Sequence, residues 1–327
     1  MTVEEALLDT AIPDHLEESW KIARRNFGPF VSFFAPAVKR YSTEEFPACG
    51  SCSFMGVSIT GGECDLQCDH CRAEILKPMP SARTPEKLWE VAQAFRSRGA
   101  GGILISGGSN VSGVVPLLPF VETMKRIKTE LHMKINVHVG LPTEEIIQGL
   151  AYVGIDSAMM DIIGSEETLE KVYHLKKVKV ADFERALGRL CEAGVNASPH
   201  IVIGLHWGKI IGEFEALRIT SQFKIASLVL VALMPAERTP MFSVIPPSPL
   251  EMSHVFGQAR LLFPKTNILL GCERPIGEHK VFTDILALKA GVNGIAYPAE
   301  GVVQMAKQLG LKASLSDMCC SLKYQGH

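Results

Sequence analysis

The sequence has no apolar run of the roughly 18 residues that a membrane-spanning helix needs. It also has little net charge, because 33 Lys and Arg residues nearly balance 35 Asp and Glu residues and leave −2. Such a chain offers no broad basic surface for nucleic acid or anionic membranes. The first twenty residues, with Glu4, Glu5, Asp9 and Asp14, lack the basic-then-apolar pattern of a signal peptide. We therefore expect a soluble, cytoplasmic protein that binds neither nucleic acid nor membranes.

The nine cysteines are unevenly distributed. Five lie between residues 49 and 71, and the others are Cys191, Cys272, Cys319 and Cys320. In a large chain without a secretory signal, reducing conditions disfavour disulfides and favour metal binding or catalysis. The clustered cysteines are therefore predicted to bind metal. Cys191 lies within a predicted helix and is expected to be a core residue.

Short apolar segments alternate with longer amphipathic stretches from Met55 onward. Nearly continuous apolarity over roughly four to eight residues is typical of parallel strands that are buried on both faces. Between them, Thr84-Pro85, Asp182 and the Ser248–Glu251 capping box are predicted to begin helices. The eight predicted strands are residues 55–60, 102–106, 134–139, 157–161, 198–204, 226–233, 267–271 and 294–297.

Eight strands alternating with helices, with no evident linker, predict an α/β protein built on a single TIM-type (β/α)8 barrel. The barrel would span residues 49–309. Residues 1–48 would form an N-terminal helical extension, and residues 310–327 a C-terminal tail. A six-stranded open barrel is the alternative, if the last two predicted strands are absent.

Three cysteines, Cys64, Cys68 and Cys71, follow the first predicted strand. They would therefore lie at the C-terminal mouth of the barrel, where such folds place their chemistry. Three thiolates from one short loop can hold a 4Fe–4S cubane and leave its fourth iron without a protein ligand. A structural zinc site normally takes four ligands from two separated pairs, which fits this spacing less well. We call these three residues the claw.

The Cys-x3-Cys-x2-Cys spacing of the claw, in a strand-to-helix loop, resembles the radical S-adenosylmethionine (SAM) superfamily. His70 stands where that family usually has an aromatic residue. The resemblance implies that SAM binds the open iron of the cluster. One electron then cleaves SAM to methionine and a 5′-deoxyadenosyl radical, which abstracts hydrogen from an unactivated carbon. Cys64, Cys68 and Cys71 would be both the catalytic and the metal-binding residues.

Other segments resemble the SAM-binding elements of this family. The Ser106–Gly108 turn after the second strand is similar to the glycine-rich turn that binds the SAM amino group, and residues 202–213 look like the adenine-contacting region. His138 ends the third predicted strand and Asp161 ends the fourth, so both would face the barrel mouth. Arg274 could bind a carboxylate or ribose group. For each residue the alternative is an ordinary turn, cap or loop position. The predicted cofactor-binding residues are Ser106, Gly107, Gly108, His138, Asp161, Gly204 and Glu213.

A second cysteine motif, Cys49-x2-Cys52, precedes the first predicted strand. A thioredoxin-like redox pair would need a different fold, so half of a metal site is the preferred interpretation. Cys272 follows the seventh strand at the barrel mouth. We predict an auxiliary iron–sulfur cluster held by Cys49, Cys52 and Cys272, with a fourth ligand from a tail cysteine, a serine or an exogenous group. Alternatively, the Cys319–Cys320 pair replaces Cys272, with at most one of the two as a ligand.

The barrel with its short claw loop resembles the biotin synthase, lipoyl synthase and FeFe-hydrogenase maturase group. The Thr239-Pro240-Met241 segment and Cys-Glu-Arg-Pro at residues 272–275 are also similar to that group. The overall pattern looks like the two-protein lipoyl synthases. That likeness implies sulfur insertion into an octanoyl chain, with the auxiliary cluster as sulfur source. The implied partners are an octanoylated lipoyl carrier protein or domain, a paralogous radical SAM subunit and an electron donor such as ferredoxin or flavodoxin.

Two other functions stay open from the sequence. A radical SAM mutase, lyase or maturase, similar to methylornithine synthase or a hydrogenase maturase, would use one cluster and hold about four irons rather than eight. A non-catalytic iron–sulfur or zinc-binding scaffold would form no 5′-deoxyadenosine. The substrate, the carbon attacked and the oligomeric state do not follow from the sequence.

Overall fold

Parallel β-strands form the centre of the molecule. The computed structural model describes residues 2–38, 41–46 and 53–322, in which ten strands form one sheet in the order β10-β1-β9-β8-β7-β6-β5-β4-β3-β2. Every pair of neighbouring strands is parallel. The strands are β1 (Phe30–Phe34), β2 (Phe54–Ser58), β3 (Gly102–Ser106), β4 (Lys134–His138), β5 (Ser157–Asp161), β6 (Ala197–Ile203), β7 (Ser227–Ala232), β8 (Asn267–Leu270), β9 (Gly294–Ala296) and β10 (Lys312–Ser316).

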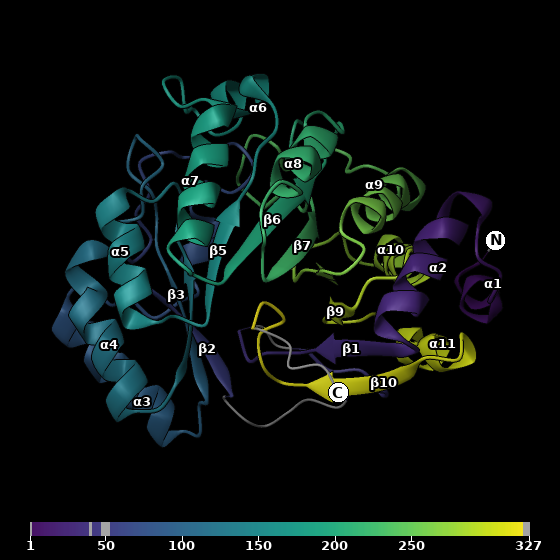
Figure 1. The fold of residues 1–327 in the computed structure, drawn as a ribbon, viewed down its shortest axis with the longest axis horizontal. Helices are drawn as coiled ribbons and strands as arrows, with labels where there is room; N and C mark the ends of the chain where they lie inside the picture. Colours follow the sequence, from purple (N-terminus) through teal and green to yellow (C-terminus); the bar gives the residue numbers. More distant parts are fainter. Residues whose placement is uncertain (1, 39–40, 47–52, 323–327) are drawn as a thin grey trace.

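Helices cover the convex face of this sheet (Figure 1). As predicted, Thr84 and Ser248 cap the helices that follow them, and Pro85 and Pro249 are the first helical residues. The third predicted start is displaced, because Asp182 lies inside its helix and accepts a hydrogen bond from the Lys179 backbone N–H. The helices are α1 (Val3–Leu8), α2 (Glu17–Phe27), α3 (Pro85–Ser97), α4 (Val121–Glu130), α5 (Glu144–Val153), α6 (Glu166–Lys171), α7 (Val180–Glu192), α8 (Glu213–Thr220), α9 (Pro249–Leu262), α10 (Glu278–Lys289) and α11 (Val302–Gln308).

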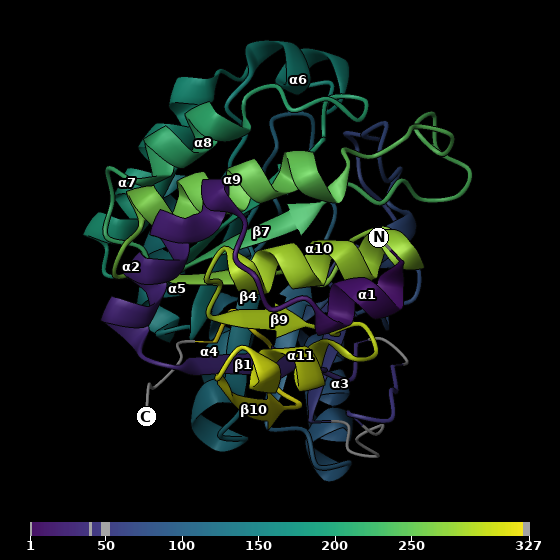
Figure 2. The ribbon, with the colours of Figure 1, turned by 90° about the vertical axis from the view of Figure 1, so that its right-hand side faces the viewer.

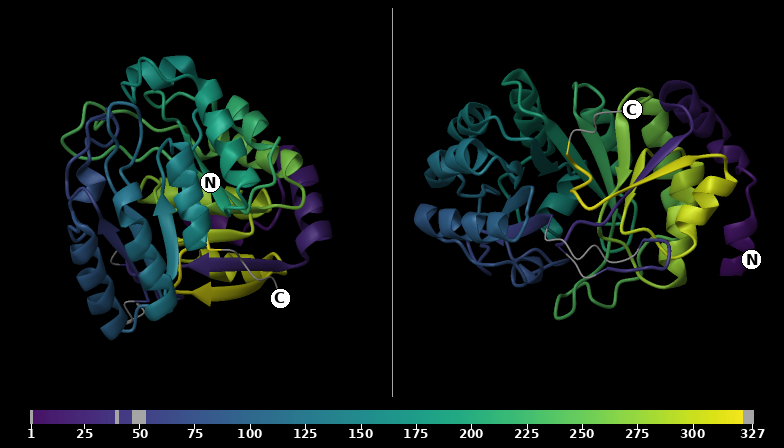
Figure 3. Two further views of the ribbon diagram at one scale, coloured as in Figure 1. Left: turned by 60° about the vertical axis from the view of Figure 1, so that its left-hand side comes forward. Right: turned by 90° about the horizontal axis from the view of Figure 1, so that it is seen from below.

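The sheet curls into a half-barrel, as the view from below shows (Figure 3). Its outermost strands are β2 and β10, and each has one strand neighbour in the part of the chain that the structure describes. The predicted α/β barrel class is confirmed, and the eight predicted strands correspond to β2 through β9. The helical description of residues 1–48 is incomplete, because β1 lies there and pairs with both β9 and β10. Likewise, the predicted tail contains β10.

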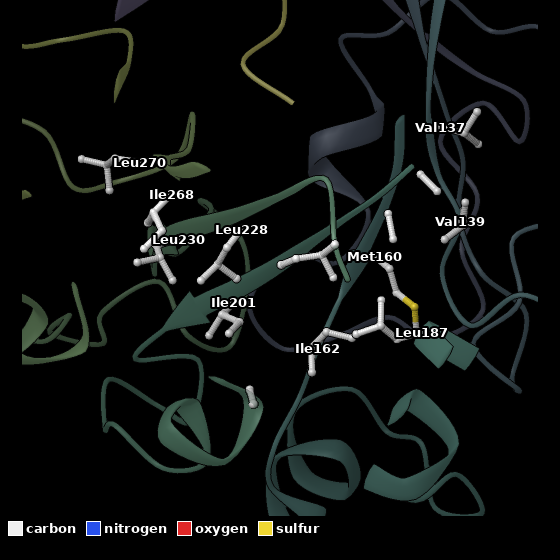
Figure 4. Close-up of a cluster of buried hydrophobic side chains, with 14 of the residues drawn as sticks. Val137, Val139, Met160, Ile162, Leu187, Ile201, Leu228, Leu230, Ile268 and Leu270 are labelled. Atoms are coloured by element: carbon white, nitrogen blue, oxygen red, sulfur yellow. The ribbon is translucent and has the colours of Figure 1, made fainter. Parts of the chain in front are cut away.

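The two faces of the sheet differ in character because side chains alternate along each strand. The outer face is apolar and packs against the helices; Figure 4 shows Val137, Met160, Leu230 and Ile268 of this face, with Leu187 of α7 next to Met160. We call the space on the inner side of the sheet the lumen. Its polar wall, on β3–β6, consists of Ser106, Asn136, His138, Ser157, Asp161, Ser198 and His200. Its apolar wall consists of Phe34, Val229, Leu269 and Ala296.

The segment after β10 folds into the lumen. The Ser53 hydroxyl, just before β2, donates to the Asp317 carbonyl at 2.7 Å, and Cys319 packs against Phe54. Farther along, the Ser198 hydroxyl donates to the Ser321 carbonyl at 3.5 Å. Residues 317–322 therefore bridge the open side of the half-barrel and lie against the starts of β2 and β6. None of the helices in the described ranges is both long and apolar enough to cross a membrane.

Candidate active site

The claw occupies the loop between β2 and α3. The backbone turns tightly there, with the N–H of Cys71 and of Arg72 both donating to the Cys68 carbonyl, at 3.2 and 2.9 Å. The Cys68 and Cys71 sulfurs and a ring nitrogen of His70 lie within 4.8 Å of one another. The structure thus brings two of the three claw thiols together with the residue between them.

The electrostatics of the claw suit metal binding. A hydrogen bond from the Cys68 thiol, together with His70, lowers the pKa of Cys71 to about 4 against the opposing effect of burial. The same interaction with Cys71, together with burial, raises the pKa of Cys68 well above its usual range. One proton is therefore shared by two thiols, which leaves a thiolate at Cys71. Thiolates are the protein ligands of iron–sulfur clusters, so the donor set fits the predicted group.

Neighbouring loops hold the claw in place. His174 bridges it, with Nδ1 2.8 Å from the Leu66 carbonyl and Nε2 3.2 Å from the Asp69 carboxylate. The loop after β7 also reaches the claw, because the Met241 N–H donates to the Asp69 carbonyl at 3.3 Å. Met241 is buried. The Thr239-Pro240-Met241 segment thus packs directly against the claw.

The glycine turn after β3 docks on the claw loop. The Gly108 N–H donates to the Thr60 hydroxyl at 2.7 Å. A Cβ atom at Gly108 would lie only 2.0 Å from the Glu63 carbonyl oxygen and 2.5 Å from the Cys64 Cβ, so glycine is required for this close approach. The predicted turn is therefore in contact with the predicted cluster ligands.

Three predicted residues and two that sequence reasoning missed meet at the polar wall. The Ser106 hydroxyl lies 3.0 Å from His138 Nδ1, and the His138 ring packs edge-on against His200 at 6.2 Å. Burial, followed by the proximity of His200, lowers the pKa of His138 to about 4, so its imidazole is neutral. The Tyr173 hydroxyl donates to Asp161 Oδ2 at 3.0 Å. Strand alternation from Ser198 could have identified His200, but no sequence signal identifies Tyr173.

Gly204 and Glu213, both predicted to bind SAM, meet at the start of α8. Glu213 is only 4% exposed, and its Oε1 accepts the Gly204 N–H at 2.7 Å. Its Oε2 is buried and has no hydrogen-bond partner among the described residues. Both residues lie in the loop after β6 and at the start of α8, which border a small pocket. The pocket is also lined by Ile162, Thr168, Val202 and Leu205.

Glu213 is expected to make stability depend on pH. Burial raises its pKa to about 7 in the folded chain, although backbone N–H groups beginning with that of Gly204 oppose the rise. The folded state therefore binds more protons than the unfolded chain between about pH 4.5 and 7, and the contribution of Glu213 to stability is lost as pH rises through that window. The loss amounts to at most about 3 kcal/mol. Urea unfolding of Glu213→Gln apoprotein should lack this part of the pH dependence; identical pH profiles for variant and wild type would contradict the assignment.

Arg274 does not have the predicted ligand-binding role. Its side chain is fully buried, and Nε donates to Asp284 Oδ1 at 2.5 Å. The same guanidinium donates to the Gly271 and Tyr297 carbonyls at 2.7 and 2.9 Å. Each of these hydrogen bonds ends on a backbone carbonyl or on the buried Asp284 carboxylate, because a charge at this depth is stable only when paired. Arg274 therefore links the backbone just before Cys272 to the backbone just after β9.

The predicted auxiliary ligands fall in two groups. Cys49 and Cys52 lie outside the described residues. Cys272 meets the buried Cys320, whose pKa is raised by hydrogen bonding to Cys272 and to Cys319. Hydrogen bonding from Cys320, and also from Asn136 and Ser321, lowers the pKa of Cys319 to about 7. Cys272 and the two tail cysteines, which the sequence presented as alternatives, are thus neighbours in the lumen. We call these three residues the lumen thiols.

Known proteins are similar to this chain over most of its length. Biotin synthase of Prochlorococcus marinus is 24% identical over 250 residues, covering 74% of this chain and 73% of the relative. Biotin synthase of Synechococcus sp. is 23% identical over 249 residues and covers 74% of each chain. Among solved structures, methylornithine synthase (PylB) superposes with a TM-score of 0.63 at 16% identity, over 95% of this chain and 93% of that one.

The FeFe-hydrogenase maturase HydG of Carboxydothermus hydrogenoformans superposes with a TM-score of 0.62 at 17% identity, over 96% of this chain and 76% of that one. At these identities the two structures show a shared fold. The sequence model of the radical SAM superfamily matches residues 58–210. This segment contains the claw, the glycine turn and Gly204, which are the elements that the structure assembles at the barrel mouth. Residues 58–210 of this chain are therefore similar to the radical SAM superfamily.

Proposed function

We propose that this chain is a sulfur-insertion enzyme of the lipoyl synthase type, acting on an octanoyl chain that is attached to a carrier protein. The observation that carries the proposal is the meeting of Cys272, Cys319 and Cys320 in the lumen. A second group of thiols, separate from the claw, is what an enzyme with an auxiliary iron–sulfur cluster requires. Cys49 and Cys52 are the further candidate ligands of that cluster.

The position of the lumen thiols supports this use. Cys319 interacts with Asn136 on β4. The next inward residue of that strand is His138, which contacts Ser106 directly before the glycine turn. Two residues along a strand span about 7 Å. A substrate carbon lying between the glycine turn and the lumen thiols would thus be within reach of both.

In this proposal, the chain's own residues position the reactants. The claw thiolates hold the 4Fe–4S cluster, Gly108 permits close backbone approach, and the residues around Glu213 border the pocket assigned to adenine. When bound, cluster and SAM supply a 5′-deoxyadenosyl radical, which leaves as 5′-deoxyadenosine with one substrate hydrogen atom for each C–S bond formed. The apolar wall suits an alkyl chain, because burying each CH₂ gains about 0.8 kcal/mol.

Exposed apolar residues at the mouth support a protein-bound substrate. Trp207 and Ile211 follow β6, while Phe242 and Ile245 follow β7, and Ile245 is 84% exposed. The two loops touch, because a Cβ atom at Gly208 would lie 2.2 Å from the Ile245 carbonyl oxygen. Figure 2 shows the loop after β7 projecting beyond α9. Such a rim suits the docking of an octanoylated lipoyl carrier protein or domain.

The remaining partners are part of the same proposal. A paralogous radical SAM subunit would share the two sulfur insertions, and ferredoxin or flavodoxin would deliver the electrons that cleave SAM. The described cysteines contain no disulfide. Reducing conditions such as those of the cytoplasm would keep these thiols available for metal.

Anaerobic turnover of an octanoyl-lysyl peptide with SAM and dithionite tests the proposal. The expected result is a peptide that gains one or two sulfur atoms by mass, with 5′-deoxyadenosine formed in parallel. The assay is run with and without the paralogous subunit, because one chain would insert only one of the two sulfurs. Abundant 5′-deoxyadenosine without any sulfur-containing peptide, in both arms, would contradict it.

One observation favours a second candidate, a single-cluster mutase, lyase or maturase. The polar wall offers the buried amide of Asn136, whose oxygen has no hydrogen-bond partner among the described residues. It also offers the neutral imidazoles of His138 and His200. Such groups suit a small polar substrate better than an alkyl chain. The iron content of the protein separates the two candidates.

A further inference from the structure

His70 lies inside the claw rather than beside it. One of its ring nitrogens is within 4.8 Å of both the Cys68 and the Cys71 sulfur. The ring packs against Tyr173, with 5.3 Å between centroids. Its Nδ1 is buried and has no hydrogen-bond partner among the described residues. The side chain is therefore a polar group held by an aromatic neighbour against two of the claw sulfurs.

His70 is poorly suited to being a ligand itself. It is adjacent in sequence to Cys71, and a fourth protein ligand would fill the iron position that SAM requires. The imidazole can instead donate a hydrogen bond from a ring N–H. A ring N–H within 4.8 Å of the Cys71 sulfur is attracted to it when Cys71 is a thiolate, which is its form as a ligand.

We propose that His70 is a positioning residue that donates a ring N–H to the Cys71 sulfur and thereby raises the reduction potential of the claw cluster. Reduction adds one negative charge to the cluster. A hydrogen-bond donor at a ligand sulfur stabilises that charge, and the stabilisation is strong where water is excluded. Phenylalanine at position 70 would keep the aromatic packing against Tyr173 but would donate nothing to the sulfur.

A redox titration of anaerobically reconstituted full-length protein, followed by EPR, tests this role. The claw cluster is identified as the species whose EPR signal changes when SAM is added. In His70→Phe, the ratio of reduced to oxidised claw cluster at a fixed potential should fall about tenfold, equivalent to about 59 mV for one electron. His70→Gln retains an N–H donor and should restore most of that ratio.

Three outcomes would overturn the proposal. The first is an unchanged or higher potential in His70→Phe, because the N–H would then have no effect on the cluster. The second is an equal fall in His70→Phe and His70→Gln, since the effect would then belong to the ring and not to the donor. The third is loss of claw iron from His70→Phe, because a residue needed to retain the cluster does more than donate a hydrogen bond.

Discussion

Replacing Cys68 with alanine is expected to lower 5′-deoxyadenosine formation by more than about 100-fold, because even residues that merely support a metal ligand are worth 10–100-fold. Cys68 is buried at the centre of the claw, and its thiol stabilises the Cys71 thiolate. Two remaining cysteines cannot hold a cubane that needs three protein ligands. The measurement is chromatographic quantification of 5′-deoxyadenosine after anaerobic reconstitution, together with iron analysis.

Cys191→Ala is the matched control for this experiment. Cys191 is half-buried in α7, where burial raises its pKa to about 11, and it packs against the outer layer of the core. Its loss should leave 5′-deoxyadenosine formation within about twofold, because the helix lies on the convex side of the sheet. If Cys68→Ala kept more than a tenth of the wild-type rate, the claw would not be the site of SAM cleavage.

Replacing Cys320 with alanine should separate SAM cleavage from sulfur insertion. We expect the iron content to fall from about eight to about four per chain, the sulfur-containing peptide to disappear and 5′-deoxyadenosine formation to persist. The physical reason is that Cys320 contacts both other lumen thiols. Its removal leaves Cys272 and Cys319 without the sulfur between them, while the claw lies on a different loop.

The matched control here is Leu322→Ala, which alters the same tail segment without removing a possible ligand atom. Cys272→Ala should behave like Cys320→Ala, and a Cys49→Ala/Cys52→Ala double variant shows whether those residues are also ligands. Eight irons in Cys320→Ala protein would remove the lumen thiols from the cluster. Four irons in the wild type would favour the single-cluster candidate.

The sequence predicted the central strands because both of their faces are buried. Each carries branched apolar residues toward the helices, and this signal is local. β10 was not predicted from the sequence, because it is an edge strand. None of its residues is fully buried, so it has no continuous apolar run. β1 was missed for another reason. Its apolar residues are interrupted by Ser32, and its strand partners lie about 260 to 280 residues later in the chain.

The candidate site also contains residues that could be predicted from the sequence and residues that could not. The claw and the glycine turn were predictable because a strict spacing places them on one loop and one turn. Arg274 was misassigned because its partner, Asp284, is on a helix whose approach the sequence does not encode locally. The lumen thiols required the path of residues 317–322, which depends on contacts as distant as Ser53 and Ser198.

The place of β1 in the sheet has a consequence for biosynthesis. Both of its neighbours, β9 and β10, are the last strands of the sheet to be translated. At roughly 5–20 residues per second, the ribosome needs on the order of ten seconds or more to reach them after β1 has been made. Throughout that time the Phe30–Phe34 strand, with three phenylalanines and one valine, has both edges unpaired. Unpaired apolar edges are templates for aggregation, so this strand is an aggregation-prone segment of the nascent chain until β9 and β10 have been made.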